Sequence, residues 1–77
     1  MTRREVEKLF KNLGQHFKYL RKLKGLTGIE LSRKLNLTQA QVSRIETAKQ
    51  GFSFSTFLKY CEAFELNPSD VLKKFGF

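Results

Sequence analysis

The sequence predicts an all-α domain of five short helices. Apolar residues recur at the three- and four-residue spacing that marks one face of a helix, and no run alternates as a half-buried strand would. Residues that favour helix ends stand between these apolar groups. A chain of 77 residues suffices for one hydrophobic core, so we expect residues 1–77 to form a single domain.

The first predicted helix ends before Gly25. Its apolar residues follow the pattern of an amphipathic helix: Val6, Leu9, Phe10, Leu13, Phe17 and Leu20. Basic residues fill the other faces of this helix. Gly25 is the expected end because glycine readily adopts the left-handed conformation that terminates helices. His16 lies beside the apolar stripe, so we expect it at the surface or at the edge of the core.

A capping-box sequence predicts the second helix. Thr27 precedes Glu30 by three residues, so each side chain can bond the backbone amide of the other. A helix over about 28–35 should follow. Its expected apolar contacts are Ile29, Leu31 and Leu35.

A second capping box, Thr38 to Gln41, opens a third helix over about 39–47. Its inner face carries Val42 and Ile45. Only three residues, beginning with Asn36, separate it from the second helix, and asparagine tolerates the left-handed conformation that a turn needs there. Such a short connection forces the sharp crossing of a helix-turn-helix.

Two further helices complete the prediction. Ser53 should cap a fourth helix, whose apolar residues are Phe57, Leu58, Cys61 and Phe64. The sequence from Asn67 to Asp70 has asparagine as the cap, Pro68 at the first helical position and an acid in the first turn. It opens a fifth helix that carries Val71, Leu72 and Phe75.

The net charge of +8 is concentrated in one part of the chain. Ten of the fifteen basic residues, but only two of the seven acidic residues, lie between positions 8 and 49. This segment therefore carries the whole excess of positive charge. Such a concentration indicates a surface that faces a polyanion, whereas a merely solvated basic surface is the plainer alternative.

Several function classes lack support in the sequence. The single Cys61 excludes an intramolecular disulfide and fits a reducing compartment; on the apolar side of its helix it should be buried. No run approaches the roughly 20 apolar residues of a membrane span, and no secretory signal opens the chain. Catalytic and metal-binding motifs are also missing. We expect a cytoplasmic protein that is not an enzyme and needs no cofactor or metal.

The span from Leu13 to Leu72 resembles the lambda-repressor-like, Cro/C1-type (XRE) helix-turn-helix family. The matching pieces, in order, are Leu20-Arg21-Lys22, Gly25-Leu26-Thr27, Glu30-Leu31, Leu37-Thr38-Gln39, Val42-Ser43-Arg44-Ile45-Glu46, Ser53 through Leu58, and Ala63-Phe64. The resemblance implies a five-helix domain that inserts the helix beginning at Gln39 into the major groove of double-stranded DNA.

The same resemblance implies which residues meet DNA. Base-contacting positions are occupied by Gln39, Ala40, Gln41 and Arg44, and phosphate-contacting positions by Gly28 and Ser43. Lys49, just past the third helix, is a further phosphate candidate. The family also pairs an arginine of the first helix with the glutamate that ends the third, here Arg21 and Glu46.

These side chains differ in what they can contact. Glutamine can pair with adenine and arginine with guanine, so Gln39 and Arg44 can read base edges, although Arg44 reaches phosphate as well. Ala40 offers only an apolar contact to a thymine methyl group. Gln41 has a competing role, because a capping box turns its side chain back. Ser43 either bonds a phosphate or is simply small where DNA approaches closely.

Five positions depart from the family pattern. Gly28 stands where the family has glutamine, so it can offer a phosphate only its backbone amide. Ser32 replaces alanine, and Asn36, Ala48 and Glu65 replace glycine. Asn36 suits a left-handed position. Ala48 suits one less well, which leaves open a different loop after the third helix.

The eight phenylalanines exceed what so small a core should need. Four of them are hard to place together in it: Phe52, Phe54, Phe75 and Phe77. Exposed apolar area usually marks an interface, so we expect some of these residues to form a dimer patch.

Together these features predict a sequence-specific transcriptional regulator that binds a palindromic operator as a homodimer. The alternative is an antitoxin-like or adaptor module whose Phe-rich second half binds a protein partner, with DNA binding secondary. The glutamine missing at Gly28 favours the alternative. The positive charge gathered around the helix-turn-helix favours the regulator.

Overall fold

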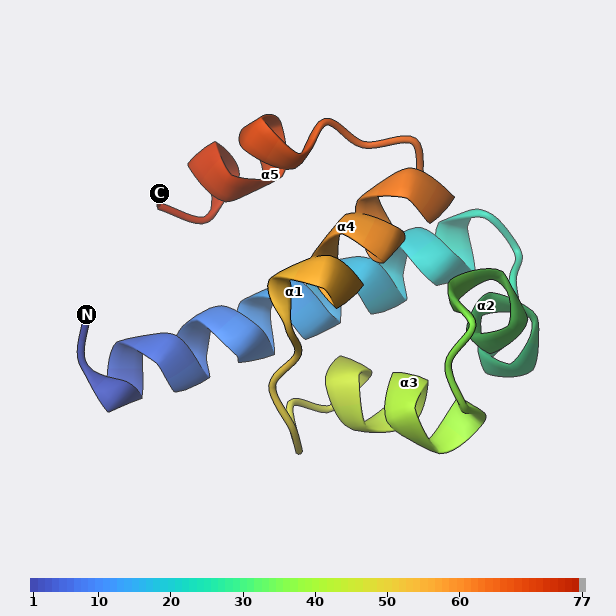
Figure 1. Cartoon of the computed structure of the whole chain (residues 1–77), viewed down its shortest axis with the longest axis horizontal. Helices are drawn as coiled ribbons and strands as arrows, with labels where there is room; N and C mark the ends of the chain where they lie inside the picture. Colours follow the sequence, from blue (N-terminus) through green and yellow to red (C-terminus); the bar gives the residue numbers. More distant parts are fainter. Residues whose placement is uncertain (77) are drawn as a thin grey trace.

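A computed structural model describes residues 1–76, which form five α-helices and no strand (Figure 1). In chain order the helices are α1 (Arg3–Leu23), α2 (Gly28–Leu35), α3 (Gln39–Glu46), α4 (Phe54–Ala63) and α5 (Pro68–Lys74). The predicted all-α fold class is confirmed. Phe77, expected in a dimer patch, lies outside the described residues. None of the helices in this part of the chain is long and apolar enough to cross a bilayer.

Side chains at the helix starts bond the backbone amides that an α-helix leaves unpaired. The capping boxes predicted at Thr27 and Thr38 are both formed, with donor–acceptor distances of 2.9–3.1 Å. A third box, between Thr2 and Glu5, begins α1 and was not predicted. Ser53 and Asn67 cap α4 and α5 as expected, with Pro68 in the first turn of α5. Most helix starts are therefore fixed by their local sequence.

Each of the four connections between helices contains a left-handed residue. Gly25 has φ of 71°, and Asn36 has φ of 55° between α2 and α3, as predicted for both. Ala48 and Glu65 also take positive φ, at 58° and 55°. The loop after α3 therefore keeps a left-handed residue at position 48 even though alanine occupies it, at a cost of about 1–2 kcal/mol relative to an unstrained residue.

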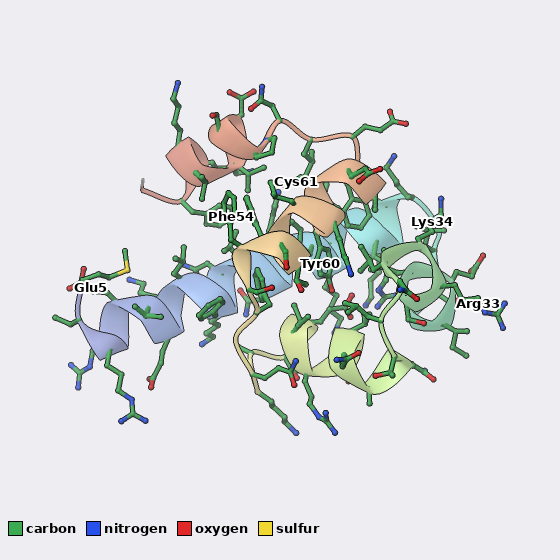
Figure 2. The ribbon with its side chains drawn as sticks, viewed as in Figure 1. Glu5, Arg33, Lys34, Phe54, Tyr60 and Cys61 are labelled. Carbon is green, nitrogen blue, oxygen red and sulfur yellow. The ribbon has the colours of Figure 1, made fainter. Side chains whose placement is uncertain are left out.

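One apolar core lies between the helices. Its buried residues are Leu13, Phe17, Leu31, Leu35, Val42, Ile45, Phe57, Tyr60, Cys61, Phe64 and Val71. Phe17 is at the centre: its ring stacks on that of Tyr60 with centroids 4.4 Å apart. Cys61 is buried, as predicted. Figure 2 shows Tyr60 inside the molecule, whereas Arg33 and Lys34 of α2 point away from it.

The helical periodicity misplaced two apolar residues. Ile29 was expected to pack inward from α2, but 45% of it is exposed. Leu58 of α4 is 40% exposed. Both helices are short, so few apolar residues define the inner face of each, and a residue at its edge can point either way. Spacing alone gives the direction of such a face only approximately.

Most of the phenylalanines pack in the core or against it. Phe52 and Phe75 are half-buried and pack against it. The edge of Phe75 meets His16, with ring centroids 5.4 Å apart, which holds α5 to α1. Burial lowers the pKa of His16, and the nearby Lys74 lowers it further. Phe54 alone of the described candidates is largely exposed, at 62%.

The helices are arranged around α1, which runs across the molecule with α3 on one side and α5 on the other (Figure 1). Gly14 of α1 lies directly against the backbone of α3. A Cβ atom at this position would overlap the backbone carbonyl oxygen of Ile45 and approach Glu46. Glycine therefore lets the two helices lie closer together than any other residue would.

Replacing Gly14 with alanine should lower the free energy of unfolding by about 1–3 kcal/mol, because the added methyl group must push α3 away from α1. Urea denaturation measures this change. Gly28→Ala is the matched control, since a Cβ atom there meets nothing within 4 Å. Equal stability of the two variants would contradict the close α1–α3 contact.

Candidate nucleic-acid interface

The helix-turn-helix consists of α2, the connecting residues 36–38 and α3. The left-handed Asn36 ends α2, and the amide of Leu37 donates to the carbonyl of Ser32 at 2.9 Å. The Thr38 cap then starts α3 at once. The turn is thus held at both sides by hydrogen bonds that its own residues make.

One side of α3 is packed and the other is open. Val42, Ile45 and Glu46 are buried. The open side carries Gln39, Ala40, Ser43 and Arg44, all of which are exposed. Gln39 and Ser43 are four positions apart, as are Ala40 and Arg44, so each pair is stacked one turn apart on the open side of the helix. The face combines amide, methyl, hydroxyl and guanidinium groups, which are the groups that can contact base edges and phosphates.

Gln41 differs from its neighbours on α3. Its Oε1 atom accepts a hydrogen bond from the backbone amide of Thr38 at 2.9 Å, and the backbone amide of Gln41 donates to the Thr38 hydroxyl at 3.1 Å. The side chain is half-buried and directed toward the start of the helix. The side chain of Gln41 therefore caps α3, which was the predicted alternative to base contact.

The remaining predicted contact residues lie at the ends of helices. Gly28 is the first residue of α2 and has open space around it. Lys49 is exposed beyond α3, and its amide donates to the carbonyl of Arg44 at 2.8 Å. This bond keeps the lysine close to the end of α3 despite its place in a loop.

Arg21 and Glu46 tie α1 to α3. The Nε atom of Arg21 lies 2.7 Å from one carboxylate oxygen of Glu46, and a terminal nitrogen lies 3.2 Å from the other. The side chains are only 13% and 6% exposed. Arg21 also donates to the carbonyl of Leu26 at 2.8 Å, so it holds the turn before α2 as well. The Leu26 contact has no signal in the sequence.

The pair has a buried neighbour in Tyr60. Burial raises the pKa of its hydroxyl, and the negative charge of Glu46 raises it further, so the phenol is protonated at neutral pH. Within residues 1–76 this hydroxyl has no hydrogen-bond partner. The ion pair itself is also largely withdrawn from water. In such surroundings the carboxylate needs its guanidinium partner.

Sequence analysis did not identify Gly14 as the residue that brings α1 against α3. A glycine inside an amphipathic helix pattern was the available signal, because such a residue often has a packing reason. Its partner could not be read from the pattern. The contact joins residues about thirty positions apart in the chain, through a backbone carbonyl that any residue possesses.

Comparison with known proteins identifies the family. The sequence model of a helix-turn-helix family matches residues 17–71. The chain belongs to the Cro/C1-type (XRE) helix-turn-helix family. Its members are DNA-binding proteins of the kind that regulate transcription. The resemblance noted in the sequence is thereby confirmed.

Solved structures show the same fold. The chain is similar to the clp gene regulator ClgR from Corynebacterium glutamicum, with a TM-score of 0.78 and 25% identity over 87% of this chain and 71% of that chain. A second crystal structure of ClgR gives a TM-score of 0.76 and 25% identity over 87% of each chain. Among curated proteins, no sequence matches the chain significantly.

Replacing Glu46 with alanine should lower the free energy of unfolding by about 3–5 kcal/mol, because it leaves the Arg21 guanidinium buried without a counter-charge. Thermal unfolding followed by circular dichroism measures the loss. The exposed pair between Arg3 and Glu7 is the control, with side chains 94% and 67% exposed. Glu7→Ala should cost less than about 1 kcal/mol. A similar small cost for Glu46→Ala would show that the buried pair is not structural.

Proposed function

We propose that this protein is a sequence-specific transcriptional regulator that acts in the cytoplasm as a homodimer on a palindromic DNA operator. The proposal rests mainly on the open face of α3, where four exposed side chains suited to DNA lie together. The opposite side of this helix is packed into the core, which fixes its position. Family membership and the likeness to ClgR, a gene regulator by its printed description, support the proposal.

In the proposed complex α3 lies in the major groove and reads base edges. Gln39, in the first turn, is placed to meet adenine, and Arg44 to meet guanine or an adjacent phosphate. Ala40 between them contacts a thymine methyl group. Ser43 bonds a phosphate or permits close approach. Gln41 contributes less, because its side chain is engaged with Thr38.

Phosphate contacts position the helix in the groove. Lys49 is exposed beside the end of α3 and carries a charge that suits the DNA backbone. At Gly28, the first residue of α2, only the backbone amide can face a phosphate, and the positive end of a helix favours such a contact. These contacts supply affinity without sequence preference.

An apolar hollow supports dimer formation. Phe54, at the start of α4, stands 62% exposed beside a hollow of about 150 Å³. The hollow is lined by residues of α1, of α4 and the loop before it, and of α5: Leu9, Phe10, Leu13, Phe52, Ser53, Phe54, Phe57 and Leu72. A second copy of the chain is the proposed occupant, with Phe54 of each copy packed against the other.

Charge supports the same occupant. Residues 50–77 hold three basic and three acidic residues, so two copies can meet through this half without the repulsion that the basic half would cause. A dimer of this kind places two α3 helices on one side of the DNA. Their half-sites are then roughly 34–36 Å apart, one turn of the duplex.

Replacing Gln39 or Arg44 with alanine should each weaken binding to the preferred operator by about 1–3 kcal/mol and relax selectivity at one base pair. Fluorescence anisotropy with the operator and its single-base variants measures both effects. Lys49→Ala is the control, because loss of a phosphate contact weakens all sequences alike. Unchanged selectivity in both the Gln39 and Arg44 variants would show that α3 does not read the bases.

Phe54→Glu should shift the protein from dimer to monomer, because the glutamate would have to enter an apolar interface. Sedimentation over a hundredfold concentration range measures the change. Leu23→Glu is the matched control: Leu23 is an apolar residue, 68% exposed, at the far end of α1. A dimer that persists in the Phe54 variant, or is lost equally in both, would contradict this interface.

The apolar hollow also supports the second candidate function, an antitoxin-like or adaptor module with a protein partner. In that case the wild-type chain is a monomer, and Phe54→Glu leaves operator binding unchanged. Sedimentation of the wild-type protein therefore distinguishes the two functions: a dimer favours the regulator and a monomer favours the interaction module.

A further inference from the structure

The first two thirds of α1, residues 3–16, lie outside the family match, which begins at residue 17. The helix nevertheless begins at Arg3 and continues unbroken to Leu23. At 1.5 Å per residue its 21 residues extend about 31 Å. In Figure 1 its N-terminal half reaches well past α3. The family resemblance gives no role to this segment, so its surface needs an explanation of its own.

A row of lysines follows one side of α1. Lys8, Lys11, Lys18 and Lys22, here called the lysine stripe, recur at helical spacing opposite the apolar side. Three are exposed and Lys18 is half-buried. No acidic residue occurs between positions 8 and 29, so Lys18 and Lys22 have no acidic neighbour one turn away in α1. Like charges in such a row repel one another in the absence of a polyanion.

The α1–α3 contact determines which side the stripe occupies. Gly14 packs against Ile45 of α3. Lys11 precedes this glycine by three residues and Lys18 follows it by four, so both lie one turn from the contact, on the same side of α1. At these two lysines the stripe therefore borders α3.

Lys11 and Lys49 both line a hollow between α1 and the loop that follows α3. The hollow has a volume of about 560 Å³, and Gln15 and Gln50 also line it. Two acidic side chains reach the same space, but each has a cationic partner: Glu46 is paired with Arg21 and Glu7 with Arg3. The unpaired charge in the hollow is that of the two lysines.

We infer that this hollow, flanked by Lys11 and Lys49, is a second contact site for DNA phosphates. The lysine stripe then contacts the phosphate backbone of the duplex beyond the base pairs that α3 reads. The inference rests on the proposed DNA-binding function. Lysine ammonium groups are compact charges without a fixed bonding plane, so they suit a sequence-independent contact along a phosphate backbone.

The test uses the full chain in which Lys11 and Lys18 are both replaced by glutamine. Binding to a 30-base-pair duplex of arbitrary sequence is followed by fluorescence anisotropy at several salt concentrations. Each lost phosphate contact lowers the slope of log K against log salt by about 0.9, so the slope should fall by roughly two. Restoring charge with Lys11→Arg and Lys18→Arg should restore the slope.

The matched control removes Lys73 and Lys74 of α5 in the same way, with the same change in net charge. An equal fall in slope in both double variants would show that only total charge matters, and no fall in the α1 variant would show that the stripe faces solvent or another partner. Either result overturns the inference. Failure of the proposed function would be distinct, because the unmodified protein would then prefer no DNA sequence.

Discussion

The structure depends on one junction, where α1 holds α3 in place. Gly14 removes the side chain that would keep the two helices apart, and the Arg21–Glu46 pair links them about two turns later along α1. Arg21 reaches the carbonyl of Leu26 as well, so the turn before α2 is fixed by the same side chain. A helix of only eight residues is barely stable alone, and α3 becomes a rigid reading surface through these contacts.

The same junction separates two surfaces of different chemistry. On the α3 side lie the lysine stripe, Lys49 and the open face of α3. On the side of α4 and α5 lies an apolar hollow beside Phe54, in a half of the chain that is neutral overall. Affinity for a polyanion and assembly of two copies can thus use different surfaces of one small domain. This arrangement matters because two copies that met through the basic surface would repel each other.

Local sequence predicted most of the helix boundaries, since the threonine caps and left-handed turns depend on residues no more than three apart. The order of the helices followed from them and from apolar spacing. Contacts between distant segments were less accessible: Gly14 meets a backbone carbonyl, which no pattern marks. Ile29 and Leu58 were placed inward because periodicity gives a face only within about one residue step. Which groups on α3 meet bases depends on the DNA itself, so those assignments come from chemistry and family resemblance.

The most direct test of the central claim, that α3 reads DNA as one half of a symmetric pair, is selection of binding sequences from a random duplex library. We expect enrichment of a palindrome with half-sites about one helical turn apart. The protein should bind this palindrome far more tightly than random DNA at the same salt concentration. Selection that enriches no sequence, with binding that is equally weak for all duplexes, would contradict the claim.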